Sequence, residues 1–78
     1  MLVKILGTGC AKCKKLEEKV KEVASKNNIS AEFQKVSEIQ DIMQYKIMMT
    51  PGLVINEKVK STGVIPNDET ILQWLKEG

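Results

Sequence analysis

The position of the two cysteines restricts the fold of this chain more than any other feature. Cys10 and Cys13 are separated by two residues, and they follow a nearly continuous apolar run over residues 2–6 and a flexible Gly-Thr-Gly segment over residues 7–9. The backbone N–H groups at the start of a helix have no intrahelical partner, and together with the helix dipole they favour a thiolate. We therefore expect a buried strand, then a helix with Cys10 at its N-terminus and Cys13 less than one turn further on.

Helix and strand patterns alternate through the first half of the chain. Apolar residues three and four apart predict a helix over residues 11–26, and an alternating pattern predicts a half-exposed strand over residues 30–36. Ser37 and Gln40 resemble a capping box, which predicts a second helix over about residues 38–46. The apolar face of that helix would consist of Ile39, Ile42, Met43 and Ile47.

The second half of the chain predicts a hairpin and a final helix. Branched and apolar residues indicate strands over residues 53–55 and 58–61, with a turn at residues 56–57 between them. Asn67 is a suitable N-cap for a helix that buries the apolar side chains near the C-terminus. The predicted order of elements is strand, helix, strand, helix, strand, strand, helix.

Composition is typical of a small globular protein. The chain has 78 residues, of which 42% are hydrophobic and 28% charged, so we expect one domain over residues 1–78. The apolar start is too short for a signal peptide, and no segment approaches the ~20 apolar residues that span a bilayer. A single close cysteine pair suits a reducing compartment, which predicts a cytoplasmic protein that uses its cysteines in catalysis or metal binding.

The charged residues argue against several classes of function. All twelve basic residues are lysines, and the three aromatic residues are scattered along the chain. Without arginine there is no bidentate fork for phosphate or guanine, so we expect no nucleic-acid partner. The chain has no histidine, which removes the commonest general base and metal ligand.

Together these elements resemble the thioredoxin fold in its shortest form. The resemblance rests on a strand leading into C-x-x-C, a second strand and helix, then Thr50-Pro51, a hairpin, Gly63 and a terminal helix. The chain is most similar to the small thioredoxin-like, redox-active disulfide proteins of archaea and bacteria, which begin with a strand and Gly-Thr-Gly-Cys-x-x-Cys. This resemblance covers essentially the whole chain. It implies an α/β fold with a four-stranded mixed sheet and helices on both faces.

The resemblance also implies a reaction and its residues. Cys10 would attack a partner's disulfide and Cys13 would resolve the product, with no cofactor or metal beyond their own internal disulfide. The peptide bond before Pro51 would be cis, and the Thr50 backbone would pair with an extended substrate segment. Lys12 either supports the thiolate of the nucleophile or is an ordinary surface lysine. A substrate groove would be formed by Gly9, Met49, Gly63 and Val64, with core packing as the alternative for the apolar members.

The partners implied are proteins that contain disulfides, and a reductase that supplies electrons; neither nucleic acid nor a membrane is expected. Some residues depart from ordinary thioredoxins. Gly9 replaces the usual tryptophan, and Ala11-Lys12 replaces the usual Gly-Pro. Lys4 stands where many thioredoxins carry a buried acid, so a proton relay of that type is not expected. We expect Lys4 to point to solvent, although a position near Cys13 would favour that thiolate by charge.

Soft-metal binding is the alternative function. Copper(I) chaperones of the ferredoxin-like fold are of similar length and also place C-x-x-C after their first strand. Their pair is normally introduced by Met-x-Cys, where this Cys is the first of the pair, and their order is strand, helix, strand, strand, helix, strand. A structural zinc site would need four ligands, so two chains would have to share one ion.

Overall fold

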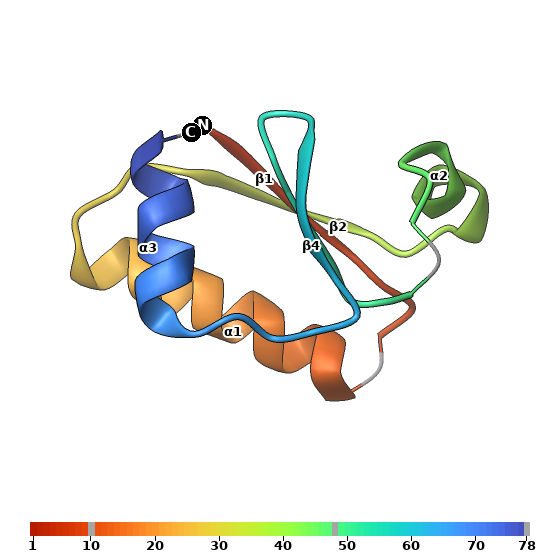
Figure 1. Ribbon diagram of the computed structural model, residues 1–78, viewed down its shortest axis with the longest axis horizontal. Coiled ribbons are helices and arrows are strands. Elements are labelled where there is room, and N and C mark those ends of the chain that lie inside the picture. The colour runs from red at the N-terminus through yellow and green to blue at the C-terminus, as the bar shows by residue number, and fades with distance from the viewer. Residues whose placement is uncertain (10, 48, 78) are drawn as a thin grey trace.

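The described part of the chain forms a four-stranded mixed sheet with three helices (Figure 1). The computed structural model describes residues 1–9, 11–47 and 49–77. The elements are β1 (Leu2–Leu6), α1 (Ala11–Lys26), β2 (Glu32–Val36), α2 (Ile39–Gln44), β3 (Gly52–Ile55), β4 (Lys58–Thr62) and α3 (Asp68–Glu77). Their order confirms the sequence prediction, and it differs from the order expected of a ferredoxin-like chaperone.

The first strand lies in the interior of the sheet, whose order is β2-β1-β3-β4. It pairs in parallel with β2 and antiparallel with β3, and β3 pairs antiparallel with β4. Every residue of β3 is buried, and only Leu2 and Lys4 of β1 are partly exposed. Interior strands that are covered on both faces read as continuous apolar runs, which explains why both were recognisable from sequence.

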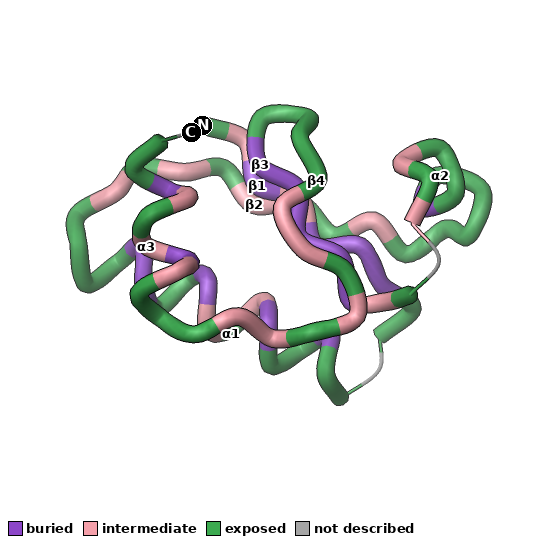
Figure 2. Tube along the Cα trace, viewed as in Figure 1, coloured by how far each residue is buried: buried purple, intermediate pink, exposed green. Residues whose placement is uncertain are grey.

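Helices cover both faces of the sheet, but unequally. Side chains of β1 and β3 pack with those of α1 and α3 in the larger core, and Figure 2 shows buried residues along β1 and β3 and at intervals along α1 and α3. The smaller core on the other face brings Leu6 and Val54 against Ile42 of α2. The short α2 therefore covers only one end of its face, and the Cys13 helix belongs to the better covered face.

The first helix ends where its sequence predicts. Asn27 donates its side-chain amide to the Val23 carbonyl at 2.9 Å, and the Ile29 N–H donates to the Ala24 carbonyl at 2.9 Å. Asn28 adopts a left-handed conformation with φ 54°. Asparagine tolerates this conformation, so the last carbonyls of α1 find donors as the chain turns back toward β2.

The second helix departs from the sequence prediction. Its N-cap is Glu38, with no side-chain capping hydrogen bond, so the capping box predicted from Ser37 and Gln40 is wrong. Only Ile42 of its expected apolar face is buried, whereas Ile39 is 63% and Met43 65% exposed. The helix is six residues long, and Ile42 is its one buried residue. It is too short to pack a longer row of apolar side chains against the sheet.

A two-residue turn joins β3 to β4. Asn56 has φ 50° and Glu57 has φ 68°, and positive φ at both central positions matches the right-handed twist of a hairpin. Asn56 Oδ1 also accepts a hydrogen bond from the Leu2 N–H at 3.0 Å. The turn predicted at residues 56–57 is therefore confirmed, and it is tied to the start of the central strand.

The third helix begins at an asparagine cap. Asn67 Oδ1 accepts a hydrogen bond from the Thr70 N–H at 2.8 Å, which confirms the predicted N-cap. Ile71 and Leu75 are the buried residues of the helix, and Lys19 of α1 lies 3.5 Å from Asp68 at its start. Among the helices described, none is both long enough and apolar enough to cross a membrane.

Replacing the cap should weaken the fold without touching its core. Asn67→Ala is expected to lower the free energy of unfolding by about 1 kcal/mol, because the Thr70 N–H loses its acceptor. Urea denaturation measures the change. Asn67→Asp is the control, since it keeps a side-chain acceptor and should retain nearly full stability. An alanine variant as stable as the parent would contradict the role of the cap.

Candidate active site

The predicted resolving cysteine lies buried in the first turn of α1. Cys13 is 5% exposed and is the first buried residue of the apolar stripe that continues through Leu16 and Val20. Cys10, the predicted nucleophile, lies outside the described residues. Because this apolar stripe packs against the sheet, it holds the Cys13 side chain below the protein surface.

Gly7 makes the close approach of this sulfur possible. A Cβ atom at residue 7 would overlap the Cys13 Sγ atom and lie 3.0 Å from its Cβ. The Gly7 N–H donates to the Val36 carbonyl at 2.9 Å, so the backbone here is held at the end of the sheet and is not a loose loop. Sequence reasoning treated this glycine as part of a flexible segment. The signal it missed is a glycine directly at the end of a buried strand, where a neighbouring side chain needs room.

The Thr50-Pro51 segment begins β3 at the same edge of the sheet. Leu6 lies opposite Gly52 in the antiparallel pair of β1 and β3, so Gly7 and Pro51 are each one residue beyond that pair. Pro51 is buried, and the peptide bond that precedes it is cis. The Cys13 sulfur and the Thr50-Pro51 segment therefore occupy the same edge of the sheet.

A hydrogen bond and a close contact join the next two predicted residues to this edge. The Gly63 N–H donates to the Pro51 carbonyl at 2.8 Å. A Cβ atom at Gly63, which has φ 72°, would lie 3.0 Å from the Cβ of Met49, itself 62% exposed. Pro51, Gly63 and Met49 thus lie together at this edge of the sheet, with Met49 exposed and Pro51 buried.

The remaining groove residues are less constrained. Gly9 has φ 90°, and a Cβ atom there would meet nothing within 4 Å. Val64 follows Gly63 and is 55% exposed, which rules out core packing for this side chain. Lys12 is an exposed residue of the first turn of α1. The structure therefore leaves these three side-chain positions accessible from solvent.

Positive charge gathers at the start of α1. Lys12, Lys14 and Lys15 are exposed, the first turn carries no acidic residue, and no ion pair among the described residues involves any of the three. Lysines further along are paired: Lys21 and Lys35 with Glu17, and Lys26 with Glu22. The unneutralised part of the helix is the end that carries Cys13.

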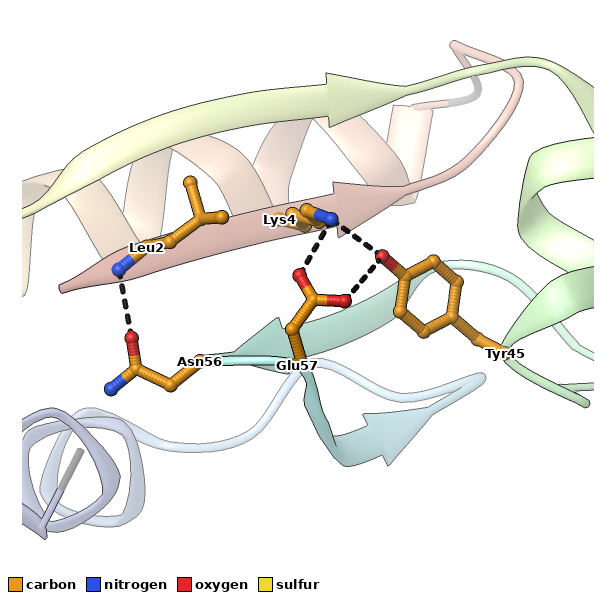
Figure 3. A network of polar contacts seen from close by, with 5 residues as sticks. All are labelled: Leu2, Lys4, Tyr45, Asn56 and Glu57. Atoms are coloured by element: carbon orange, nitrogen blue, oxygen red, sulfur yellow. Dashed lines mark hydrogen bonds and ion pairs between the residues drawn. The ribbon is translucent and has the colours of Figure 1, made fainter.

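Lys4 does not point freely into solvent, so that expectation is wrong. Its Nζ atom donates to the Tyr45 hydroxyl at 2.7 Å and lies 2.6 Å from Glu57 Oε1 (Figure 3). The Tyr45 hydroxyl in turn donates to Glu57 Oε2 at 3.3 Å. Lys4 alternates along β1 with Val3 and Ile5 of the larger core, so it lies on the face opposite α1.

This polar cluster shifts two ionisation equilibria. The hydrogen bonds that Lys4 donates to Glu57 and, second, to Tyr45 raise the pKa of the Lys4 ammonium, and the hydrogen bond from Lys4 lowers the pKa of the Glu57 carboxyl. The cluster ties β1 to the residue after α2 and to the β3–β4 turn. Lys4 is thus a structural residue of the α2 face rather than a partner of Cys13.

Similarity to known proteins identifies the family of this chain. The model of the thioredoxin domain family matches residues 1–76. The chain belongs to the thioredoxin domain family. A thioredoxin of Methanothermobacter thermautotrophicus is 35% identical over 75 residues, which cover 96% of this chain and 97% of that protein. A thioredoxin of Methanocaldococcus jannaschii is 34% identical over 76 residues, which cover 97% of this chain and 87% of that protein.

Membership of the thioredoxin family establishes the class of chemistry. The chain is a thiol–disulfide oxidoreductase, and the redox group of thioredoxins is an internal disulfide rather than a separate cofactor. Proteins of this family generally reduce protein disulfides and receive electrons from a reductase.

Adding one methyl group at Gly7 should disturb the active-site edge. Gly7→Ala is expected to lower the free energy of unfolding by about 1–3 kcal/mol, because the new Cβ atom would overlap the Cys13 sulfur. Denaturation of the reduced protein measures this. Thr8→Ala, a change at the exposed neighbour, should have little effect. Equal stability of Gly7→Ala and the parent would show that the sulfur has room to move.

The Lys4–Glu57 pair should make stability depend on pH in a defined direction. Because the folded state lowers the pKa of Glu57, the pair stabilises the fold at neutral pH, and this contribution is lost as pH falls through the lowered pKa. The raised pKa of Lys4 preserves its contribution until strongly alkaline pH. Glu57→Gln should therefore be less stable than the parent at neutral pH, with the difference vanishing in acid.

Urea unfolding from neutral to acidic pH measures this difference. Glu32→Gln removes the same charge from an exposed glutamate that forms no ion pair among the described residues, so it serves as the matched control. A Glu57→Gln deficit that persists unchanged in acid, or an equal deficit in the control, would contradict the assignment.

Proposed function

We propose that the chain reduces or exchanges disulfides in proteins through a Cys10–Cys13 dithiol/disulfide pair. The observation that carries the proposal is the burial of the Cys13 sulfur against Gly7, at the sheet edge where Thr50-Pro51 begins β3. This arrangement suits a resolving thiol, which must be close to a nucleophile on the same helix turn yet protected from outside disulfides. Family membership supports the same reaction class.

The proposed reaction has two steps. The Cys10 thiolate attacks a sulfur of the partner's disulfide, forming a mixed disulfide and releasing the partner's other sulfur as a thiolate. Cys13 then attacks Cys10 in that mixed disulfide, which releases the reduced partner and closes the internal bridge. A free cysteine with a pKa near 8.5 is only roughly 3% thiolate at neutral pH. The helix N-terminus and the charge of Lys12 would raise that fraction for Cys10.

The proposed substrate surface uses residues of three loops. Among the described residues, no backbone hydrogen bond outside the helices and strands involves Thr50. Its N–H and C=O are therefore suited to pairing with an extended segment of the partner, as a short added strand. Gly9 and the exposed side chains of Met49 and Val64 would contact the segment, and Gly63 holds this surface against Pro51. Methionine adapts to varied partners because its side chain is flexible and polarisable.

A trapping experiment separates the roles of the two cysteines. Cys13→Ser should accumulate a mixed disulfide with a disulfide-containing protein such as insulin, because Cys10 can attack but nothing resolves the product. Cys10→Ser should accumulate almost none, because Cys13 is 5% exposed. Non-reducing electrophoresis with mass spectrometry measures both.

Two controls make the result decisive. The Cys10→Ser/Cys13→Ser double variant should form no mixed disulfide, and the parent should turn over insulin in the presence of a dithiol reductant. Trapping by neither single variant, together with tight copper(I) binding and no disulfide turnover by the parent, would overturn the proposal in favour of a soft-metal chaperone. When the trapping pattern is the expected one, the reduction potential of the pair distinguishes a reductant from an oxidant.

A further inference from the structure

A small cavity lies beside Cys13, on the side of the sulfur away from the Thr50-Pro51 segment. Its volume is about 150 Å³, and its walls include residues from the end of β1, the start of α1 and the end of β2. Because β2 and β3 flank β1 on opposite sides, a cavity that includes Lys35 and Ser37 of the β2 end lies on the other side of β1 from Met49 and Gly63. Gly9, a residue of the proposed substrate surface, lines the cavity as well.

The cavity borders the Cys13 side chain. Ile5, Gly7 and Cys13 all line it, and Gly7 contributes no side chain that could separate the cavity from the Cys13 sulfur. A protein loop cannot enter a space of this size. An apolar protein cavity of about 150 Å³ accommodates a molecule such as benzene, which has about six heavy atoms. A small thiol of similar size fits the same volume.

The rim of the cavity favours a negative charge. Lys14 and Lys35 both line it, with Thr8 and Ser37 as further polar groups, and no carboxylate is among the lining residues. Lys35 shares its charge with Glu17, whose Oε2 lies 3.1 Å away, whereas Lys14 is in no ion pair among the described residues. Lys14 can therefore neutralise the charge of an anionic ligand, whereas Lys35, which is already paired with Glu17, contributes less.

We propose that this cavity admits a small thiol carrying a carboxylate or sulfonate, and that such a thiol exchanges directly with the Cys13 sulfur. The inference rests on the proposed function of the cysteine pair and adds a second route to it. Large disulfide substrates meet the pair on the Thr50-Pro51 side, whereas small anionic thiols reach it through the β2 side. Lys14 and Lys35 select the charge of the thiol.

The exchange balances without any further reactant. In the oxidised protein, a thiolate RS⁻ attacks Cys13 Sγ, the Cys10–Cys13 bond breaks, and Cys10 leaves with the electron pair and takes a proton from solvent. A second RS⁻ attacks the sulfur of the first in the mixed disulfide, forming RSSR and releasing Cys13 as a thiolate that is then protonated. The protein disulfide is reduced, and two small thiols are oxidised.

The test isolates Cys13 in a Cys10→Ser background. There the Cys13 thiolate attacks RSSR, which forms the same mixed disulfide and releases RS⁻. Three small symmetrical disulfides differ in charge: dithiodipropionate is anionic, hydroxyethyl disulfide is neutral and cystamine is cationic. Mass spectrometry follows the rate of each, and the ratio of the anionic to the neutral rate cancels any change in the reactivity of the thiol itself.

Removing a lysine of the rim should lower that ratio. Lys14→Gln and Lys35→Gln are each expected to reduce it roughly threefold, as for one exposed ionic contact, and to raise the relative rate of cystamine. Lys15→Gln is the matched control, because it removes the same charge from the adjacent exposed residue, which does not line the cavity. The ratio of the anionic to the neutral rate in Lys15→Gln should equal that of the parent.

Each outcome decides the inference. An equal ratio in Lys14→Gln and the parent, or an equal fall in Lys15→Gln, would overturn it, because the preference would then be absent or due to overall charge. Lys14→Gln alone suffices if loss of the Glu17 contact unfolds Lys35→Gln. Insulin turnover by the parent is unaffected by this result, whereas failure of that turnover would overturn the proposed function itself.

Discussion

The active-site edge depends on the absence of a side chain at Gly7. The strand β1 ends one residue before Gly7, and the first turn of α1 packs its Cys13 sulfur into the space that a Cβ atom at Gly7 would otherwise fill. The same strand end lies next to the start of β3, so one packing constraint brings the cysteine helix and the Thr50-Pro51 segment together. Because protein interiors are closely packed, a shift at this point would be transmitted to both.

Alternation along β1 separates apolar packing from charge. Val3 and Ile5 face α1. Lys4 faces the opposite side, where it donates a hydrogen bond to Tyr45 and forms an ion pair with Glu57. The face of β1 beneath the cysteine helix therefore carries no ionisable side chain. A proton relay from a buried acid of this strand is not available, so protons that Cys13 exchanges must pass by another route. The lysine at residue 4 instead joins α2 and the hairpin turn to the sheet.

Sequence reasoning succeeded where local chemistry decides the structure. The ends of α1, the Asn56-Glu57 turn and the Asn67 cap each depend on residues adjacent in sequence, and the structure confirms them. It failed where the outcome depends on distant partners. The apolar face predicted for α2 required a wider contact with the sheet than a six-residue helix makes, and the partners of Lys4 lie forty-one and fifty-three residues away in the chain. The role of Gly7 was also inaccessible, because overlap with a sulfur on the next element can be judged only in three dimensions.

Ion pairs between lysines and glutamates determine which part of α1 keeps an unneutralised positive charge. Glu17 binds Lys21 four residues further on and Lys35 of β2, and the hydrogen bond from Lys21, followed by that from Lys35, lowers the pKa of its carboxyl. No carboxylate precedes Glu17 in the chain, and the three lysines before it on α1, Lys12, Lys14 and Lys15, form no ion pair among the described residues. Their charge adds to the positive end of the helix dipole instead of cancelling it. An anionic group thus meets a favourable electrostatic environment at the first turn of α1, which contains Cys13.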